Sequence, residues 1–146
     1  MKILFVLLIF ALASSASEIK SYRIMSERAT WIESVHYCRR MSGELVVIES
    51  QDELNRLSNY LQNQGYGESD LFWTSGNDYI SRGKFYSITT GNLLPFTEWC
   101  RGQPDNYGGN ERCVHLYFQD GSYKMNDLVC EDKAKAICER YVKTYI

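Results

Sequence analysis

Two segments near the start of the chain carry apolar residues at the three- and four-residue spacing of an amphipathic helix. The first segment is marked by Trp31, Val35, Cys38 and Met41, and the second by Leu54, Leu57 and Leu61. Each segment follows a capping box, in which a hydroxyl and a carboxylate three residues later bind each other's unpaired backbone amides: Thr30 with Glu33, and Ser50 with Glu53. The pattern predicts two helices, which end at Gly43 and Gly65.

Short runs of β-branched and aromatic residues predict the strands of a sheet. In chain order these runs are 21–25, 44–48, 71–74, 113–118, 122–125 and 135–141, with a turn at 119–121. Segment 75–109 shows little periodicity, and its aromatic residues predict an ordered loop with a small core of its own. We find no internal repeat and no linker, so we expect one α+β domain, with the helices first and an antiparallel sheet and long loop after.

Residues 1–16 differ in composition from the rest of the chain. Lys2 precedes an unbroken apolar run at 3–13, and small residues follow as far as Ala16. This is the layout of a secretory signal peptide, with cleavage after Ala16. The apolar run is shorter than the roughly 20 residues that span a bilayer, which weighs against a membrane anchor. We therefore expect a secreted, extracellular domain over 17–146, with no membrane span.

Charge and motifs exclude several classes of function. The formal net charge is −2, and no basic patch offers a surface to nucleic acid. The chain lacks the Gly-x-Ser-x-Gly element of many hydrolases. Its two histidines, His36 and His115, fall on separate predicted elements and do not form a zinc pair. We expect neither a nucleic-acid-binding protein nor an enzyme.

The five cysteines indicate disulfide bonds. They are Cys38, Cys100, Cys113, Cys130 and Cys138. Four or more cysteines in an exported chain are typical of a disulfide framework, although the sequence alone does not give the pairing. The odd number leaves one thiol that either stays free or bridges two chains.

A short stretch late in the chain is rich in oxygen-bearing side chains. These are Gln103, Asp105, Glu111, Asn126 and Asp127. Three carboxylates and two side-chain amides, with no histidine or thiolate required, suit a hard cation such as Ca²⁺. The set predicts a calcium-dependent binding module rather than a catalyst.

Taken in order, these features resemble the C-type lectin domain family, over essentially all of the mature chain. The resemblance is carried by Trp31, Cys38, and the segments 44–50, 73–76, 103–105, 111–114, 126–127 and 137–139. It implies the C-type lectin fold, with two helices, small antiparallel sheets and a long loop that binds calcium and sugar. It also implies the disulfides Cys38–Cys138 and Cys113–Cys130. Cys100 would then be a free thiol or the bridge of a disulfide-linked homodimer.

The resemblance further implies how the site works. One Ca²⁺ would be held by the side chains of Gln103, Asp105, Glu111, Asn126 and Asp127, with the Asp127 carbonyl oxygen as an addition. The bond before Pro104 would be cis, so that the residues on either side face one ion. The same five side chains and Tyr107 would contact the sugar. The order Gln-Pro-Asp is associated with galactose and N-acetylgalactosamine, and Glu-Pro-Asn with mannose-type sugars.

The chain departs from the family pattern at several positions. Tyr107 stands where galactose-binding members place a tryptophan under the sugar, so it is either a smaller stacking ring or an ordinary loop residue. Met125 replaces a tryptophan before the Asn-Asp pair and can fill the same apolar space. A second calcium ion, present in some members, needs acids where this chain has Asn106 and Arg112, so we predict a single ion.

The expected partners are galactose-type glycans on glycoproteins or cell surfaces. The alternative is a protein-binding domain of the same fold that has no sugar recognition. Such domains generally lose the ligand residues, and this chain keeps all five.

Overall fold

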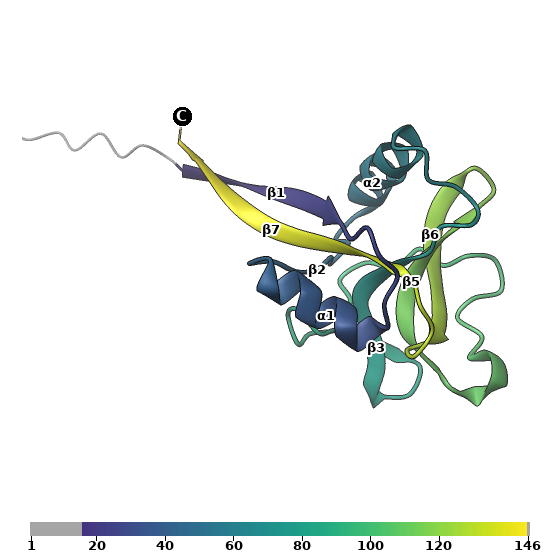
Figure 1. Cartoon of the computed structure of the whole chain (residues 1–146). Helices are drawn as coiled ribbons and strands as arrows, with labels where there is room; N and C mark the ends of the chain where they lie inside the picture. The colour runs from purple at the N-terminus through teal and green to yellow at the C-terminus, as the bar shows by residue number, and fades with distance from the viewer. Residues whose placement is uncertain (1–15, 146) are drawn as a thin grey trace, which may run out of the picture.

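The computed structural model describes residues 16–145, so the predicted signal peptide lies outside the described residues except for Ala16. The strands are β1 (Ala16–Ile24), β2 (Glu44–Leu45), β3 (Phe72–Ser81), β4 (Lys84–Ser87), β5 (Glu111–Gln119), β6 (Ser122–Val129) and β7 (Lys135–Tyr145) (Figure 1). The helices are α1 (Trp31–Arg40) and α2 (Gln51–Asn63), and a 3₁₀ turn, η1, spans Tyr107–Gly109. The domain is therefore α+β. Within the described part of the chain, no helix combines the length and the apolar character needed to cross a membrane.

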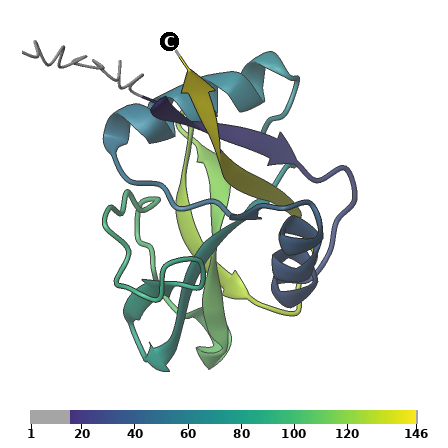
Figure 2. The same ribbon diagram turned by 90° about the vertical axis from the view of Figure 1, so that its left-hand side faces the viewer.

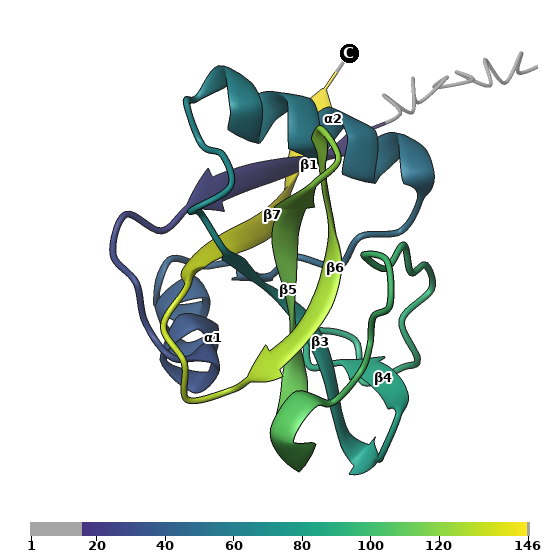
Figure 3. The same ribbon diagram turned by 90° about the vertical axis from the view of Figure 1, so that its right-hand side faces the viewer.

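The strands form one sheet in the order β1-β7-β3-β5-β6, with β2 beside β7 and β4 beside β3 (Figures 2 and 3). Among residues 16–145, each strand pair is antiparallel except β3 with β7, which is parallel. The predicted antiparallel pairing is confirmed for the other ladders, and the parallel β3–β7 pair was not predicted. Strand periodicity shows which face of a strand is buried, but it does not show which strand lies next to it.

The two helix starts behave differently. At α1 the predicted capping box forms, because the Thr30 amide donates to the Glu33 carboxylate at 2.8 Å and the Glu33 amide donates to the Thr30 hydroxyl at 3.4 Å. At α2 only half of the box forms. Ser50 Oγ accepts the Glu53 amide at 3.2 Å, but the Glu53 carboxylate accepts from the Glu49 amide, at 2.7 Å, and not from the Ser50 amide. The other oxygen of the Glu53 carboxylate, Oε1, accepts from Lys20 in a buried charge network.

The two helix ends also differ. Gly65, with a φ of 87°, lies just beyond α2 as predicted. At α1 the left-handed residue is Ser42, with a φ of 57°, rather than Gly43. Gly43 is required for another reason, since a Cβ there would lie 2.6 Å from the Glu139 carbonyl oxygen. It allows β2 to approach β7 closely.

Two apolar clusters fill the domain, one against each helix. Trp31, Val35 and Cys38 of α1 belong to one cluster, and Leu54, Leu57 and Leu61 of α2 belong to the other. Cys38–Cys138 and Cys113–Cys130 are disulfide-bonded, with Cα–Cα distances of 5.3 and 5.2 Å, and these are the pairings that the resemblance implies. They close loops of 100 and 17 residues, which on the chain-entropy account contributes about 5 and about 3 kcal/mol.

Segment 75–109 is more regular than the sequence predicts. Strand β3 continues to Ser81 and turns back as β4, whereas the sequence analysis ended this strand at Thr74. Asn77 and Asp78 are polar but only 5% and 2% exposed, so hydrophobic periodicity does not mark them as strand. The loop's aromatic residues also do not form a separate core. Phe85 belongs to the α2-side cluster, and Trp99 packs on it with ring centroids 4.9 Å apart.

Strand β2 is shorter than the predicted strand over 44–48. Only Glu44 and Leu45 pair with β7 in a ladder. Residues 46–48 are buried and extended but outside a strand, and the Val46 amide donates to the Ile137 carbonyl at 2.9 Å. The apolar run therefore predicts the buried residues correctly, but the predicted strand is longer than the observed one.

Cys100 is 4% exposed, and its thiol lies 4.0 Å from the Tyr117 carbonyl oxygen. Burial raises the pKa of the thiol, which lowers the fraction present as reactive thiolate. Of the two alternatives for this residue, burial favours the free thiol. We expect the purified protein to run as a monomer on a non-reducing gel, and its thiol to react with a thiol reagent only after denaturation. A reducible dimer that disappears in Cys100→Ser would contradict this expectation.

Candidate metal centre

The loop that precedes β5 and the hairpin of β3 and β4 lie together at the end of the domain away from α2 (Figures 1 and 3). Asp105, Glu111 and Asp127 meet at this end, each with a carboxylate oxygen within 4.8 Å of the others. Asp127 is 1% exposed and Glu111 9%, while Asp105 is exposed. Burial, together with the nearby charges of Asp127 and Asp105, raises the pKa of Glu111. A cation among these oxygens would offset that repulsion.

Backbone amides of the loop hold the carboxylates in place. Asp127 accepts from the Asp105 amide at 3.1 Å and from the Asn106 amide at 2.8 Å. Glu111 accepts from the Tyr107 amide at 2.9 Å. Asn106 is in the left-handed region, with a φ of 48°, and its Oδ1 accepts from the Glu111 amide at 3.2 Å. The loop is therefore folded around the acidic groups by its own hydrogen bonds.

Gln103 lies next to the acidic group. The Gln103–Pro104 peptide bond is cis, as the resemblance implies. Gln103 Oε1 accepts from the Asp105 amide at 3.0 Å. An amide oxygen has two lone pairs, so this contact leaves one free for a cation.

Asn126 supplies the fifth predicted ligand and is held by a neighbour that the sequence analysis did not select. Asn126 Nδ2 lies 3.1 Å from His115 Nε2, and His115 Nδ1 lies 3.2 Å from the Leu116 carbonyl oxygen. Burial lowers the pKa of His115 to about 4, so the ring is neutral near pH 7. Its Nδ1–H donates to the carbonyl, and Nε2 accepts from the amide of Asn126.

This orientation leaves Asn126 Oδ1 buried, with no hydrogen-bond partner among the described residues. A buried acceptor without a donor costs about 1–3 kcal/mol. Amide oxygens are common ligands of Ca²⁺, so a cation at this site would satisfy the atom. The residues present therefore fit the ion that the sequence predicts.

The contact between His115 and Asn126 could have been found from the sequence. The predicted turn at 119–121 sets the register of the hairpin, and in that register His115 pairs with Asn126. From the sequence, His115 was placed on a strand and excluded from a zinc pair, but its partner across the turn was not predicted.

We expect His115→Phe to weaken calcium binding about fivefold. The substitution keeps a buried ring but removes the acceptor that fixes the Asn126 amide, and one such hydrogen bond is worth about 1 kcal/mol. Calorimetric titration with CaCl₂ measures the effect. His36→Phe, on the exposed face of α1, is the matched control and should leave the affinity unchanged. Equal affinities in both variants would remove His115 from the site.

Tyr107 and Arg112 flank Glu111 in the sequence, four residues before it and one after it. Tyr107, on η1, is 79% exposed. Arg112 donates from Nε to Asp78 Oδ1 at 2.9 Å. Its guanidinium is thus engaged with β3.

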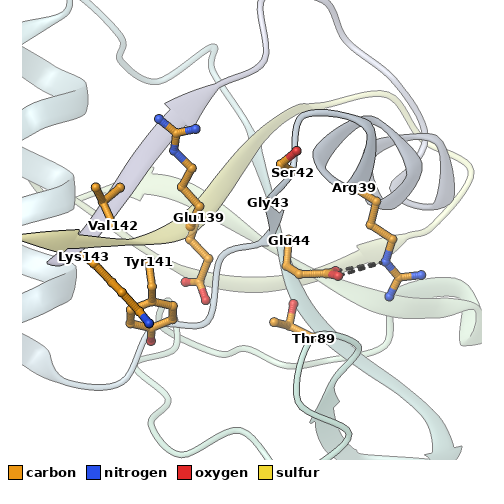
Figure 4. Close-up of a pocket in the computed structure, with 10 residues that line it drawn as sticks. Arg39, Ser42, Gly43, Glu44, Thr89, Glu139, Tyr141, Val142 and Lys143 are labelled. Atoms are coloured by element: carbon orange, nitrogen blue, oxygen red, sulfur yellow. Dashed lines mark hydrogen bonds and ion pairs between the residues drawn. The ribbon is translucent and has the colours of Figure 1, made fainter. Parts of the chain in front are cut away.

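A separate groove of about 770 Å³ lies along β7, β2 and the end of α1 (Figure 4). Arg39 and Glu44 form an ion pair at its edge, with Nε and Oε2 3.0 Å apart. None of the predicted calcium ligands is among the residues that line this groove.

Comparison with known proteins identifies the class of this domain. The family described as Lectin C-type domain matches residues 27–140. The chain belongs to the C-type lectin family.

Individual relatives agree. The chain is 38% identical to C-type lectin 37Db of Drosophila melanogaster, over 82% of this chain and 77% of that protein. It is 33% identical to Salivary C-type lectin 2 of Aedes albopictus, over 84% of each. Among solved structures, the mouse scavenger receptor C-type lectin carbohydrate-recognition domain superposes with a TM-score of 0.71 at 25% identity, over 83% of this chain and 89% of that one.

A second solved structure is the C-type lectin domain of murine dendritic cell inhibitory receptor 2, which was determined in complex with an N-glycan. It superposes with a TM-score of 0.68 at 26% identity, over 84% of this chain and 91% of that one.

Proposed function

We propose that this protein is a secreted lectin that binds carbohydrate through one Ca²⁺, held by Gln103, Asp105, Glu111, Asn126 and Asp127. Two observations carry the proposal: the group of three carboxylates within 4.8 Å, and the buried oxygen of Asn126, the residue before Asp127, which lacks a partner among the described residues. Membership of the C-type lectin family and a predicted signal peptide support the same conclusion.

A bound Ca²⁺ takes six to eight oxygens, so five side chains leave coordination positions for two vicinal sugar hydroxyls. The protein's own groups then set which hydroxyls fit. The Gln103 amide nitrogen donates to a hydroxyl oxygen, and the carboxylates accept hydroxyl protons. With a donor at the first motif position and an acceptor at the third, we propose a preference for galactose and N-acetylgalactosamine. Tyr107 would lie against the apolar face of the sugar ring.

The direct test is retention on galactose-agarose in millimolar CaCl₂, followed by elution with EDTA. The proposal predicts retention that depends on calcium and competition by free galactose more than by mannose. Binding to a protein partner that is unchanged in EDTA would instead favour the alternative of a protein-binding domain. Absence of calcium binding by calorimetry would overturn the proposal.

The order of donor and acceptor gives a prediction about specificity. The double substitution Gln103→Glu with Asp105→Asn should shift preference from galactose toward mannose. Because it exchanges one donor and one acceptor, we expect the ratio of affinities to change on the order of tenfold. A glycan array with calcium present measures the ratio.

The matched control makes the same two changes on the exposed start of α2, as Gln51→Glu with Asp52→Asn, and should leave the array profile unaltered. If the Gln103 and Asp105 variant also keeps the original profile, the donor–acceptor explanation of specificity is wrong.

A further inference from the structure

Two arginines converge on one buried carboxylate beside the candidate metal centre. Asp78, in β3, has a side chain only 3% exposed. Arg112 donates from Nε to Asp78 Oδ1 at 2.9 Å and from Nη2 to the Asp78 carbonyl at 2.8 Å. Asp78 Oδ2 accepts from the Gly83 amide at 2.8 Å and lies 4.0 Å from Arg82 Nη1. The carboxylate is therefore bound on both oxygens.

The same arginines attach the β3–β4 hairpin to the loop that carries the ligands. Arg82, in the turn of the hairpin, donates from Nη2 to the carbonyl of Gly109 in η1. Arg112 directly follows Glu111, and its guanidinium lies 5.0 Å from the centre of the Tyr79 ring. The loop is thus bonded to the hairpin at two points, one in η1 and one beside a predicted ligand. The ribbon of Figure 3 shows the loop and the hairpin at the same end of the domain.

These contacts offset the free-energy cost of ordering the loop. Its residues 107–110 are exposed, and two of them are glycines, so ordering the loop is costly in conformational entropy. The three clustered carboxylates also repel one another when no cation is present. Charge-assisted hydrogen bonds such as the partly buried one between Arg112 and the Asp78 carboxylate are among the stronger polar contacts in proteins. They can hold the loop without a metal.

We propose that Asp78, Arg82 and Arg112 form a clamp that keeps loop 105–111 in its binding conformation. These are positioning residues, since none of them is a predicted ligand. The consequence for calcium affinity rests on the proposed function, whereas the consequence for the order of the metal-free loop does not.

The test compares amide hydrogen exchange of the full domain in EDTA. Asp78→Asn and, at a more exposed position, Arg82→Gln should each accelerate exchange of the Tyr107, Gly109 and Glu111 amides about tenfold. The Cys100 amide, which donates to the Met125 carbonyl at 2.8 Å outside the loop, should be unaffected. The matched control is Asp120→Asn, which breaks the exposed pair that Asp120 forms with Arg101 at 3.3 Å and should change none of these rates.

Calcium titration of the same variants is the second readout. The wild type should bind one ion per chain, and Asp78→Asn should bind it about tenfold more weakly. Unchanged loop exchange in both Asp78→Asn and Arg82→Gln would overturn the clamp. A wild type that binds no calcium would overturn the proposed function, while the exchange rates in EDTA would still decide whether the clamp exists.

Discussion

Asp127→Asn is expected to abolish calcium binding at millimolar concentrations of the ion. Asp127 is the most buried of the three clustered carboxylates, at 1% exposed, and it also accepts the amides of Asp105 and Asn106. The substitution keeps the shape of the side chain but removes the charge of the most buried carboxylate in the group. Removing one member of a buried, charge-paired site costs roughly 3 kcal/mol, so the affinity should fall by about a hundredfold or more.

Thermal unfolding with and without calcium measures this loss. A ligand that binds only the folded state raises the midpoint temperature of unfolding, Tm. Calcium should therefore raise the Tm of the wild type but not that of Asp127→Asn. Asp120→Asn makes the same chemical change at an exposed carboxylate and should keep the full increase. Unfolding in EDTA separates loss of the ion from loss of the fold. A calcium-dependent increase of wild-type size in Asp127→Asn would exclude this carboxylate as a ligand.

The parts of the site that the sequence predicts are those encoded by neighbouring residues. The cis bond at Pro104 follows from the resemblance, and the acidic residues stand out because oxygen ligands gather in one stretch. The contacts that orient these ligands were missed because they come from elsewhere in the chain. His115 reaches Asn126 across a hairpin, and Arg112 reaches Asp78 across the sheet, 34 residues away in sequence. Counting across the predicted turn at 119–121 would have indicated the first pair, whereas nothing in the sequence pairs Arg112 with Asp78.

The same distinction applies to the fold. Both helices were predicted because apolar spacing and capping are local properties. The extension of β3 was not predicted, because Asn77 and Asp78 are polar residues whose burial depends on partners in other elements. Asn77 Nδ2 donates to the Tyr86 carbonyl at 3.3 Å, and Asp78 accepts from Arg112. Burial of polar groups is decided by tertiary hydrogen bonds, which become visible only when the strands are placed together.

A second large effect is expected at the opposite end of the domain. Lys20, in β1, is 11% exposed, and its Nζ lies 2.9 Å from the Glu53 carboxylate and 3.0 Å from that of Glu139. It also donates to the Val47 carbonyl at 2.7 Å. Burial alone would lower the pKa of Lys20, but the hydrogen bond to Glu53 and the charge of Glu139 raise it well above its usual value. The ammonium therefore neutralises two carboxylates that are themselves buried.

We expect Lys20→Met to lower the free energy of unfolding by about 3–5 kcal/mol near pH 7, because it leaves Glu53 and Glu139 buried without their cation. Denaturant unfolding measures the change. The control is Arg39→Met, which breaks the half-exposed pair with Glu44 and should cost less than about 1 kcal/mol. A similar small loss in both variants would mean that the Lys20 network contributes little to stability.

The pH dependence of the free energy of unfolding is a second test of the Lys20 network, because the pKa shifts of its carboxylates fix the direction of the change. In the wild type the folded pKa of Glu53 is lowered, although burial alone would raise it, because Tyr22 and Lys20 donate to the carboxylate. A lowered pKa contributes stability above the unfolded value of about 4.5, and this contribution is lost as the pH falls through the folded value. The Lys20 ammonium remains charged throughout the acid range, so its own titration does not enter.

Glu139 behaves in the opposite sense. Burial raises its folded pKa, and Val47 and Lys20 oppose that rise. Without Lys20, the folded pKa of both carboxylates should rise further. A raised pKa contributes stability below the unfolded value, and this contribution is lost as the pH increases through the folded value. The stability deficit of Lys20→Met should therefore shrink as the pH is lowered from 7 toward 4, whereas a deficit independent of pH would mean that the lysine acts through packing of its alkyl chain.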